Sequence, residues 1–175
     1  MHDTGRRYWP NHRGERYSLK GSESATSIGV LNVLTIKRLG VDDARILIAG
    51  TRIKAEEIGV PMCIAVTDES GQLIAFERMD GGKITSTTIA LDKAFTAAGA
   101  KRSTQSYGAL SQPGNAAFGI NSAINGRLVV VAGGIPVTID GDVVGGVGVS
   151  SGTPAQDHDC AQAGIDFFLA GLERR

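Results

Sequence analysis

The sequence has few aromatic residues, no excess of either charge and no long apolar run, and each absence excludes a class of protein. Lysine plus arginine and aspartate plus glutamate both number 18, so no overall field attracts nucleic acid or an anionic membrane. No stretch of about 18 apolar residues occurs, so we expect no membrane span. At 5% aromatic residues, the chain has few rings on which nucleobases could stack. The two cysteines, Cys63 and Cys160, fit no disulfide framework or zinc pattern.

What is present indicates a globular protein with closely packed backbones. The chain has 175 residues, of which 42% are hydrophobic, and this predicts one soluble domain. Its 24 glycines are about twice the average share. We therefore predict a domain over residues 34–175, preceded by an arm over residues 1–33.

The arm is basic and carries Tyr8, Trp9 and Tyr17. Because rings bury much area with little loss of entropy, we expect the arm to pack against a neighbouring subunit. A leader or expression tag and a nucleic-acid-binding arm are the alternatives. No apolar segment of a secretory signal follows the basic start, so a cytoplasmic location is expected.

Hydrophobic periodicity and turn residues predict the elements of the domain. They are a helix from Asp42 or Asp43 to about Ile58, a hairpin over 62–78, helices over 84–100 and 103–110, strands over 127–132, 136–139 and 143–149, and a helix over 153–172. This order shows no βαβ alternation and predicts an α+β fold, with one antiparallel sheet and helices on its faces. The first helix carries two apolar stripes, so we expect another subunit to cover the second stripe.

The turn between the last strand and the last helix is the first candidate site. Gly148 to Gly152 match the nucleophile pattern G-x-S-x-G, but no acid and base follow on later elements, so a glycine turn before a capped helix is the alternative. The amides of residues 152–156 are expected to receive a small anion at the helix N-terminus. The alternative is that the capping side chains already satisfy these amides. The predicted binding residues here are Ser150, Ser151, Gly152, Thr153 and Gln156.

Charged side chains near this turn suggest the chemistry. Arg78 or Lys93 would neutralise a carboxylate, and Asp80 or Asp157 would move a proton. Arg78 could instead pair with Asp80, and Lys93 could extend along the apolar surface to water. The remaining predicted substrate-binding residues are Thr96 and the ring side chains of an apolar wall, Phe76, Tyr107 and Phe118.

Metal signals are weak, because Asp157, His158 and Asp159 are consecutive on a helix and point in different directions. His158 is a candidate axial ligand for haem, and a solvated surface histidine is the alternative. No cofactor is certain, and haem is the candidate.

Several sequence blocks resemble the haem-degrading/GlcG–HbpS-like family, which is also similar to the C-terminal domain of PduO-type adenosyltransferases. The blocks are AEEIGVP at 55–61, AVTD at 65–68 with Gly71, FERMDG at 76–81, DKAFTAA at 92–98, GGIP at 133–136, VGGVGVS at 144–150 and GTPAQD at 152–157. The resemblance implies a profilin-like α/β/α fold with a five-stranded antiparallel sheet flanked by helices. It also implies a homo-oligomer, from a dimer up to an octamer.

The resemblance leaves two functions open. Some relatives bind haem or iron, and others accompany catabolic pathways for small molecules. A secretion signal and acidic E-x-x-E iron motifs, which exported haem-binding members carry, are not evident here. We therefore expect a catabolic enzyme or accessory enzyme acting on a small organic acid, as a tautomerase, deaminase, hydrolase or lyase. The alternative is a haem- or tetrapyrrole-binding or haem-degrading protein, with propionates held by Arg78 or the helix amides and iron held by His158.

Overall fold

The structure, a computed structural model, describes residues 34–173, so the predicted arm over residues 1–33 lies outside the described residues. Four α-helices and four strands make up the domain. In chain order they are α1 (Val41–Glu57), β1 (Cys63–Asp68), β2 (Leu73–Arg78), α2 (Ser86–Ala100), α3 (Thr104–Leu110), β3 (Gly134–Ile139), β4 (Asp142–Ser150) and α4 (Pro154–Leu172).

The four strands form one sheet in the order β2-β1-β4-β3, and every neighbouring pair is antiparallel. β1 is therefore central, and its Cys63 lies opposite Ser150 of β4 and Arg78 of β2. The strand expected over 127–132 is not formed, so the prediction of five strands is wrong by one. Val129 N–H instead donates to Thr96 Oγ1 of α2 at 3.0 Å, which diverts this segment from the sheet.

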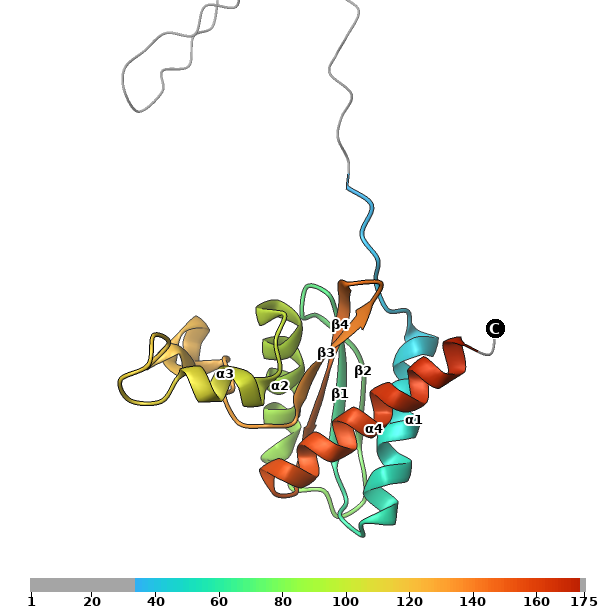
Figure 1. Ribbon diagram of the computed structural model, residues 1–175. Coiled ribbons are helices and arrows are strands. Elements are labelled where there is room, and N and C mark those ends of the chain that lie inside the picture. Colours follow the sequence, from blue (N-terminus) through green and yellow to red (C-terminus); the bar gives the residue numbers. More distant parts are fainter. Residues whose placement is uncertain (1–33, 174–175) are drawn as a thin grey trace, which may run out of the picture. The chain divides into compact units, whose positions relative to one another are not determined.

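Helices cover both faces of the sheet (Figure 1). α1 and α4 lie on one face, over the larger core, which includes Leu47, Val66 and Phe168. α2 lies on the other face, over a small cluster of Cys63, Ala65, Ala90 and Ala94. The α+β fold, with its antiparallel sheet between helical layers, is thus confirmed.

Glycines on β4 allow α2 to lie close to the sheet. A Cβ added at Gly148 would overlap the Ala90 carbonyl oxygen, and one at Gly146 would lie 2.5 Å from the Ala94 carbonyl oxygen. Both approaches are far below van der Waals contact, so only glycine fits this interface. The glycine-rich last strand is therefore explained by helix packing.

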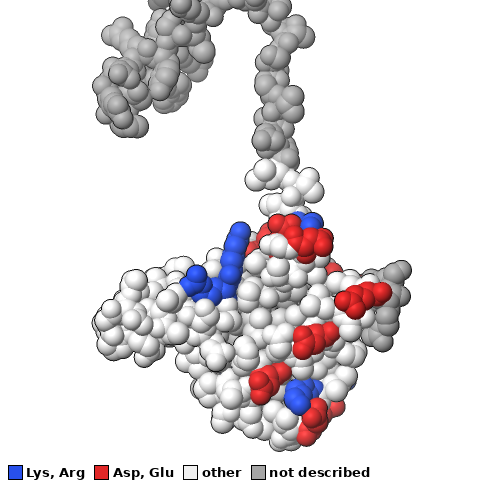
Figure 2. Space-filling view, in the orientation of Figure 1, with Lys and Arg blue, Asp and Glu red and all other residues white. Residues whose placement is uncertain are grey.

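A lobe without charge projects beside α3. No charged residue occurs between Arg102 and Arg127, and the lobe formed by α3 and the loop after it is white in Figure 2. Two short 3-10 turns, Ile120–Ser122 and Ile124–Gly126, give this loop its only helical structure. Among residues 34–173, no helix is both long and apolar enough to cross a bilayer.

Candidate functional site

The N-terminus of α4 is closed by the protein's own side chains. Gly152 N–H donates to Asp157 Oδ1 at 2.9 Å, and Thr153 N–H donates to Gln156 Oε1 at 2.9 Å. Gln156 N–H in turn donates to Thr153 Oγ1 at 3.3 Å, which completes the capping box. Pro154 has no N–H to offer. Capping thus occupies the N–H groups of Gly152, Thr153 and Gln156, which supports the capping alternative over an open anion seat.

Lys93 and Asp157 form a buried ion pair beside this turn. Lys93 Nζ donates to Asp157 Oδ2 at 2.7 Å and to the Val149 carbonyl oxygen at 2.8 Å. The two side chains are 1% and 5% exposed, so neither the open pocket nor the route to water expected for Lys93 exists. Burial lowers the pKa of Lys93, against the opposing effect of its hydrogen bond to Asp157. The pair joins α2, β4 and α4.

Other predicted site residues make structural contacts. Thr96 Oγ1 donates to the Asp92 carbonyl oxygen at 2.6 Å and accepts from Val129. Ser151 is buried with a φ of 128°, and its Oγ accepts from Lys83 N–H at 3.0 Å. Ser150 is buried at the end of β4. These contacts fix the segments around the α4 turn.

The structure does not bring the expected cations and rings together. Arg78 and Asp80 are both exposed, and among residues 34–173 no ion pair joins them. Phe76 packs beside the α2 cluster from β2, one edge of the sheet. Tyr107 lies on α3, which contacts β3 at the other edge. Phe118 is 66% exposed in the uncharged lobe. No single apolar wall is formed.

The role of His158 as an axial ligand for haem stays a prediction. Its Nδ1 is buried and has no hydrogen-bond partner. A metal-binding histidine normally donates its second ring nitrogen's proton to an acceptor, which fixes the ring. Residues 34–173 contain no group of three or more histidine, cysteine, aspartate or glutamate side chains placed to hold a metal ion.

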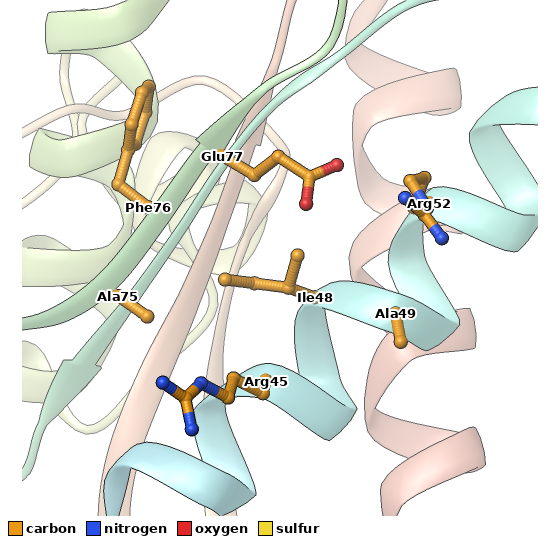
Figure 3. A pocket seen from close by; sticks show the side chains of 7 residues that line it. All are labelled: Arg45, Ile48, Ala49, Arg52, Ala75, Phe76 and Glu77. Carbon is orange, nitrogen blue, oxygen red and sulfur yellow. The ribbon is translucent and has the colours of Figure 1, made fainter.

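A groove between α1 and β2 combines apolar surface with charge (Figure 3). It encloses about 350 Å³ and is lined by Arg45, Ile48, Ala49, Arg52, Ala75, Phe76 and Glu77. The α1 residues are spaced i, i+3, i+4 and i+7, so they share one helix face. Figure 3 shows Glu77 pointing toward α1 and Phe76 pointing away from the groove. Apart from Phe76, our sequence analysis did not identify these residues as a site.

The two guanidinium groups in the groove have only weak partners. Arg45 Nη1 lies 3.0 Å from Asp42 Oδ1, and both side chains are largely exposed. Arg52 Nε lies 3.6 Å from Glu56 Oε1. Exposed pairs of this kind contribute about 0–1 kcal/mol. Each arginine can therefore exchange its present partner for a ligand carboxylate at little cost.

Comparison with known proteins identifies the family. Residues 39–166 match the family described as haem degrading protein HbpS-like. The chain belongs to this family. It is 39% identical over 115 residues to an uncharacterized 15.0 kDa protein of the dhaT-dhaS intergenic region of Citrobacter freundii, covering 66% of this chain and 81% of that one. It is 34% identical to the corrinoid adenosyltransferase PduO of Salmonella typhimurium, over 69% of this chain and only 36% of PduO.

Several solved structures share the fold. Klebsiella pneumoniae ORFY has a TM-score of 0.78 at 32% identity, covering 79% of this chain and 96% of ORFY. The structure described as a PduOC:Heme complex has a TM-score of 0.72 at 32% identity, covering 74% and 94%. HbpS itself has a TM-score of 0.69 at 26% identity, covering 77% and 93%. The resemblance stated from the sequence blocks is thus confirmed.

Proposed function

We propose that this HbpS-like protein binds haem or a related tetrapyrrole in the groove between α1 and β2. A relative of the same fold is known as a complex with haem, and the family is described as haem degrading. The observation that carries the proposal here is the pairing of two arginines with an apolar floor in one groove. A haem-type tetrapyrrole presents the matching chemistry, an apolar ring with two carboxylates.

The residues of the groove fit the organic part of such a ligand. Ile48, Ala49 and Ala75 offer small apolar surfaces to a flat ring. Arg45 and Arg52 are seven residues apart, so they are separated by about 10 Å along α1 and can each face a carboxylate. The groove volume of about 350 Å³ is near the lower end for ligand sites. Part of the ring would therefore extend outside the groove.

Two features of the structure weigh against the alternative of an enzyme acting on a small organic acid. Its binding seat, the α4 N-terminus, is occupied by Thr153, Gln156 and Asp157. Lys93, its expected cation, is committed to Asp157. A tetrapyrrole whose carboxylates contact Arg45 and Arg52 requires neither the α4 N-terminus nor a free Lys93.

We also propose that the protein is a homo-oligomer. The second apolar stripe predicted on α1 includes Ile53, whose side chain is 52% exposed. The same helix also lines the groove. A neighbouring subunit over this side of α1 would cover that stripe and the part of a ligand that extends from the groove. The arm over residues 1–33 remains a prediction, with a subunit contact as its expected role.

A haemin titration followed by Soret absorbance tests the tetrapyrrole proposal. The unaltered protein is expected to saturate at one haemin per chain. The double variant Arg45→Gln/Arg52→Gln is expected to bind at least about tenfold more weakly, because two charge-assisted contacts are lost. Arg102→Gln is the matched control, since Arg102 is exposed and lies outside the groove. A titration of the unaltered protein that does not saturate would refute the proposal.

A further inference from the structure

We infer that the groove recognises its ligand through carboxylates and an apolar face rather than through a metal, so that a metal-free porphyrin dicarboxylate binds as well as haem. This inference rests on the proposed tetrapyrrole function and specifies the class of ligand. It concerns selectivity, because a site that depends on an iron ligand rejects the free porphyrin whereas a carboxylate site accepts both.

The first step is the donor chemistry of the groove. None of its seven lining residues is a histidine, cysteine, methionine or tyrosine, which are the side chains that serve as axial ligands to haem. Arginine stays protonated and has no lone pair to offer to a metal. Glu77 is therefore the one lining side chain able to bind iron, through a carboxylate oxygen.

The cysteine and methionine sulfurs of the described residues are also poorly placed to bind iron in the groove. Cys63, Cys160 and Met62 are fully buried in the core. Met79 Sδ accepts a hydrogen bond from Met62 N–H at 3.3 Å. Burial raises the pKa of the Cys160 thiol to about 11, so this sulfur is a poor ligand at neutral pH. None of these side chains lines the groove.

The third step is the charge distribution along the groove. The Arg45 side chain faces one acidic partner, Asp42, which is largely exposed. Arg52 lies near Glu56, and Glu77 points toward α1 on the same side (Figure 3). A ligand carboxylate is therefore attracted by the two guanidinium groups and repelled by the Glu77 carboxylate. This predicts opposite effects of removing an arginine and removing the glutamate.

The test compares three ligands in one detergent buffer: haemin, protoporphyrin IX and protoporphyrin IX dimethyl ester. Haemin and protoporphyrin IX are expected to bind with dissociation constants within about threefold of each other. The dimethyl ester is expected to bind at least about tenfold more weakly, since it has no carboxylates to face the guanidinium groups. Absorbance and porphyrin fluorescence follow the titrations.

Single variants test the roles of the charged residues. Arg45→Gln and Arg52→Gln are each expected to weaken the binding of haemin and protoporphyrin IX equally. Glu77→Gln is expected to strengthen the binding of both dicarboxylates, which a merely structural role would not produce. Arg102→Gln controls for the loss of one positive charge from the surface.

Three results would overturn the inference or its basis. If haemin binds in an Arg45-dependent manner and protoporphyrin IX does not, the proposed function stands and the inference is wrong. If Glu77→Gln weakens haemin alone, the glutamate ligates iron and the inference is again wrong. If neither ligand binds, the proposed function itself fails.

Discussion

Replacing Lys93 by methionine would separate the contribution of the buried ion pair from that of simple packing. Methionine keeps most of the length of the lysine side chain but cannot donate a hydrogen bond. In the variant, the Asp157 carboxylate, 5% exposed, retains Gly152 N–H as a donor. The Val149 carbonyl oxygen also loses the lysine. The variant therefore buries a charge that has no counterion.

The expected loss of stability is large for a single substitution. Removing one partner of a buried pair costs about 3–5 kcal/mol, because the other charge stays uncompensated. A domain of this size loses about 2–4 °C in melting temperature for each kcal/mol, so the expected fall is roughly 6–20 °C. Urea unfolding followed by circular dichroism, together with a thermal melt, measures both quantities.

A double variant checks the physical reason for this loss. Lys93→Met/Asp157→Asn removes the buried charge and keeps an oxygen that can accept from Gly152 N–H. It is expected to be more stable than Lys93→Met by at least about 1 kcal/mol. The reasoning fails if Lys93→Met costs less than about 1 kcal/mol or if the second substitution adds to the damage.

Three further predictions concern the fold. Gly148→Ala is expected to lower the melting temperature sharply, because the added Cβ would overlap the Ala90 carbonyl oxygen. Gly99→Ala is expected to stabilise the fold by up to about 1 kcal/mol, because no atom lies within 4 Å of the added Cβ. Similar melting temperatures for the two variants would contradict the packing. Thr153→Ala is expected to cost about 1 kcal/mol in urea unfolding, and no loss would contradict the capping role. Burial of Asp68 opposes ionisation, but hydrogen bonds from Ser70 and Gln72 outweigh it and lower the pKa of Asp68. Asp68 thus stabilises the fold above about pH 4 and loses that effect as pH falls through its lowered pKa, so Asp68→Asn should flatten the acid branch of stability against pH; an unchanged branch would refute this.

Local signals in the sequence predicted most of the elements. The Thr153-Pro154-Ala155-Gln156 pattern predicted the start of α4 because capping depends on residues that are neighbours in the chain. The glycines of β4 likewise predicted a close approach to its backbone. The apolar run over 127–132 predicted a strand that does not form. Its conformation depends on Thr96, which lies more than thirty residues earlier and accepts a hydrogen bond from Val129 N–H.

The site was harder to predict because its residues meet only after folding. Lys93 and Asp157 were both predicted as functional residues. They lie 64 positions apart in the chain and pair with each other in the fold, so neither charge is free for a ligand. The capping alternative at α4 was stated beside the anion seat, and local sequence alone did not decide between them. The groove could not be predicted without knowing that β2 lies beside α1. The seven-residue spacing of Arg45 and Arg52 was visible in the sequence, but it does not show which strand faces them.

A crystal structure of the protein with haemin is the most direct measurement of where the ligand binds. The account predicts that the macrocycle lies between α1 and β2, with its carboxylates at Arg45 and Arg52. A macrocycle bound elsewhere, for example with its iron on His158, would contradict the central claim.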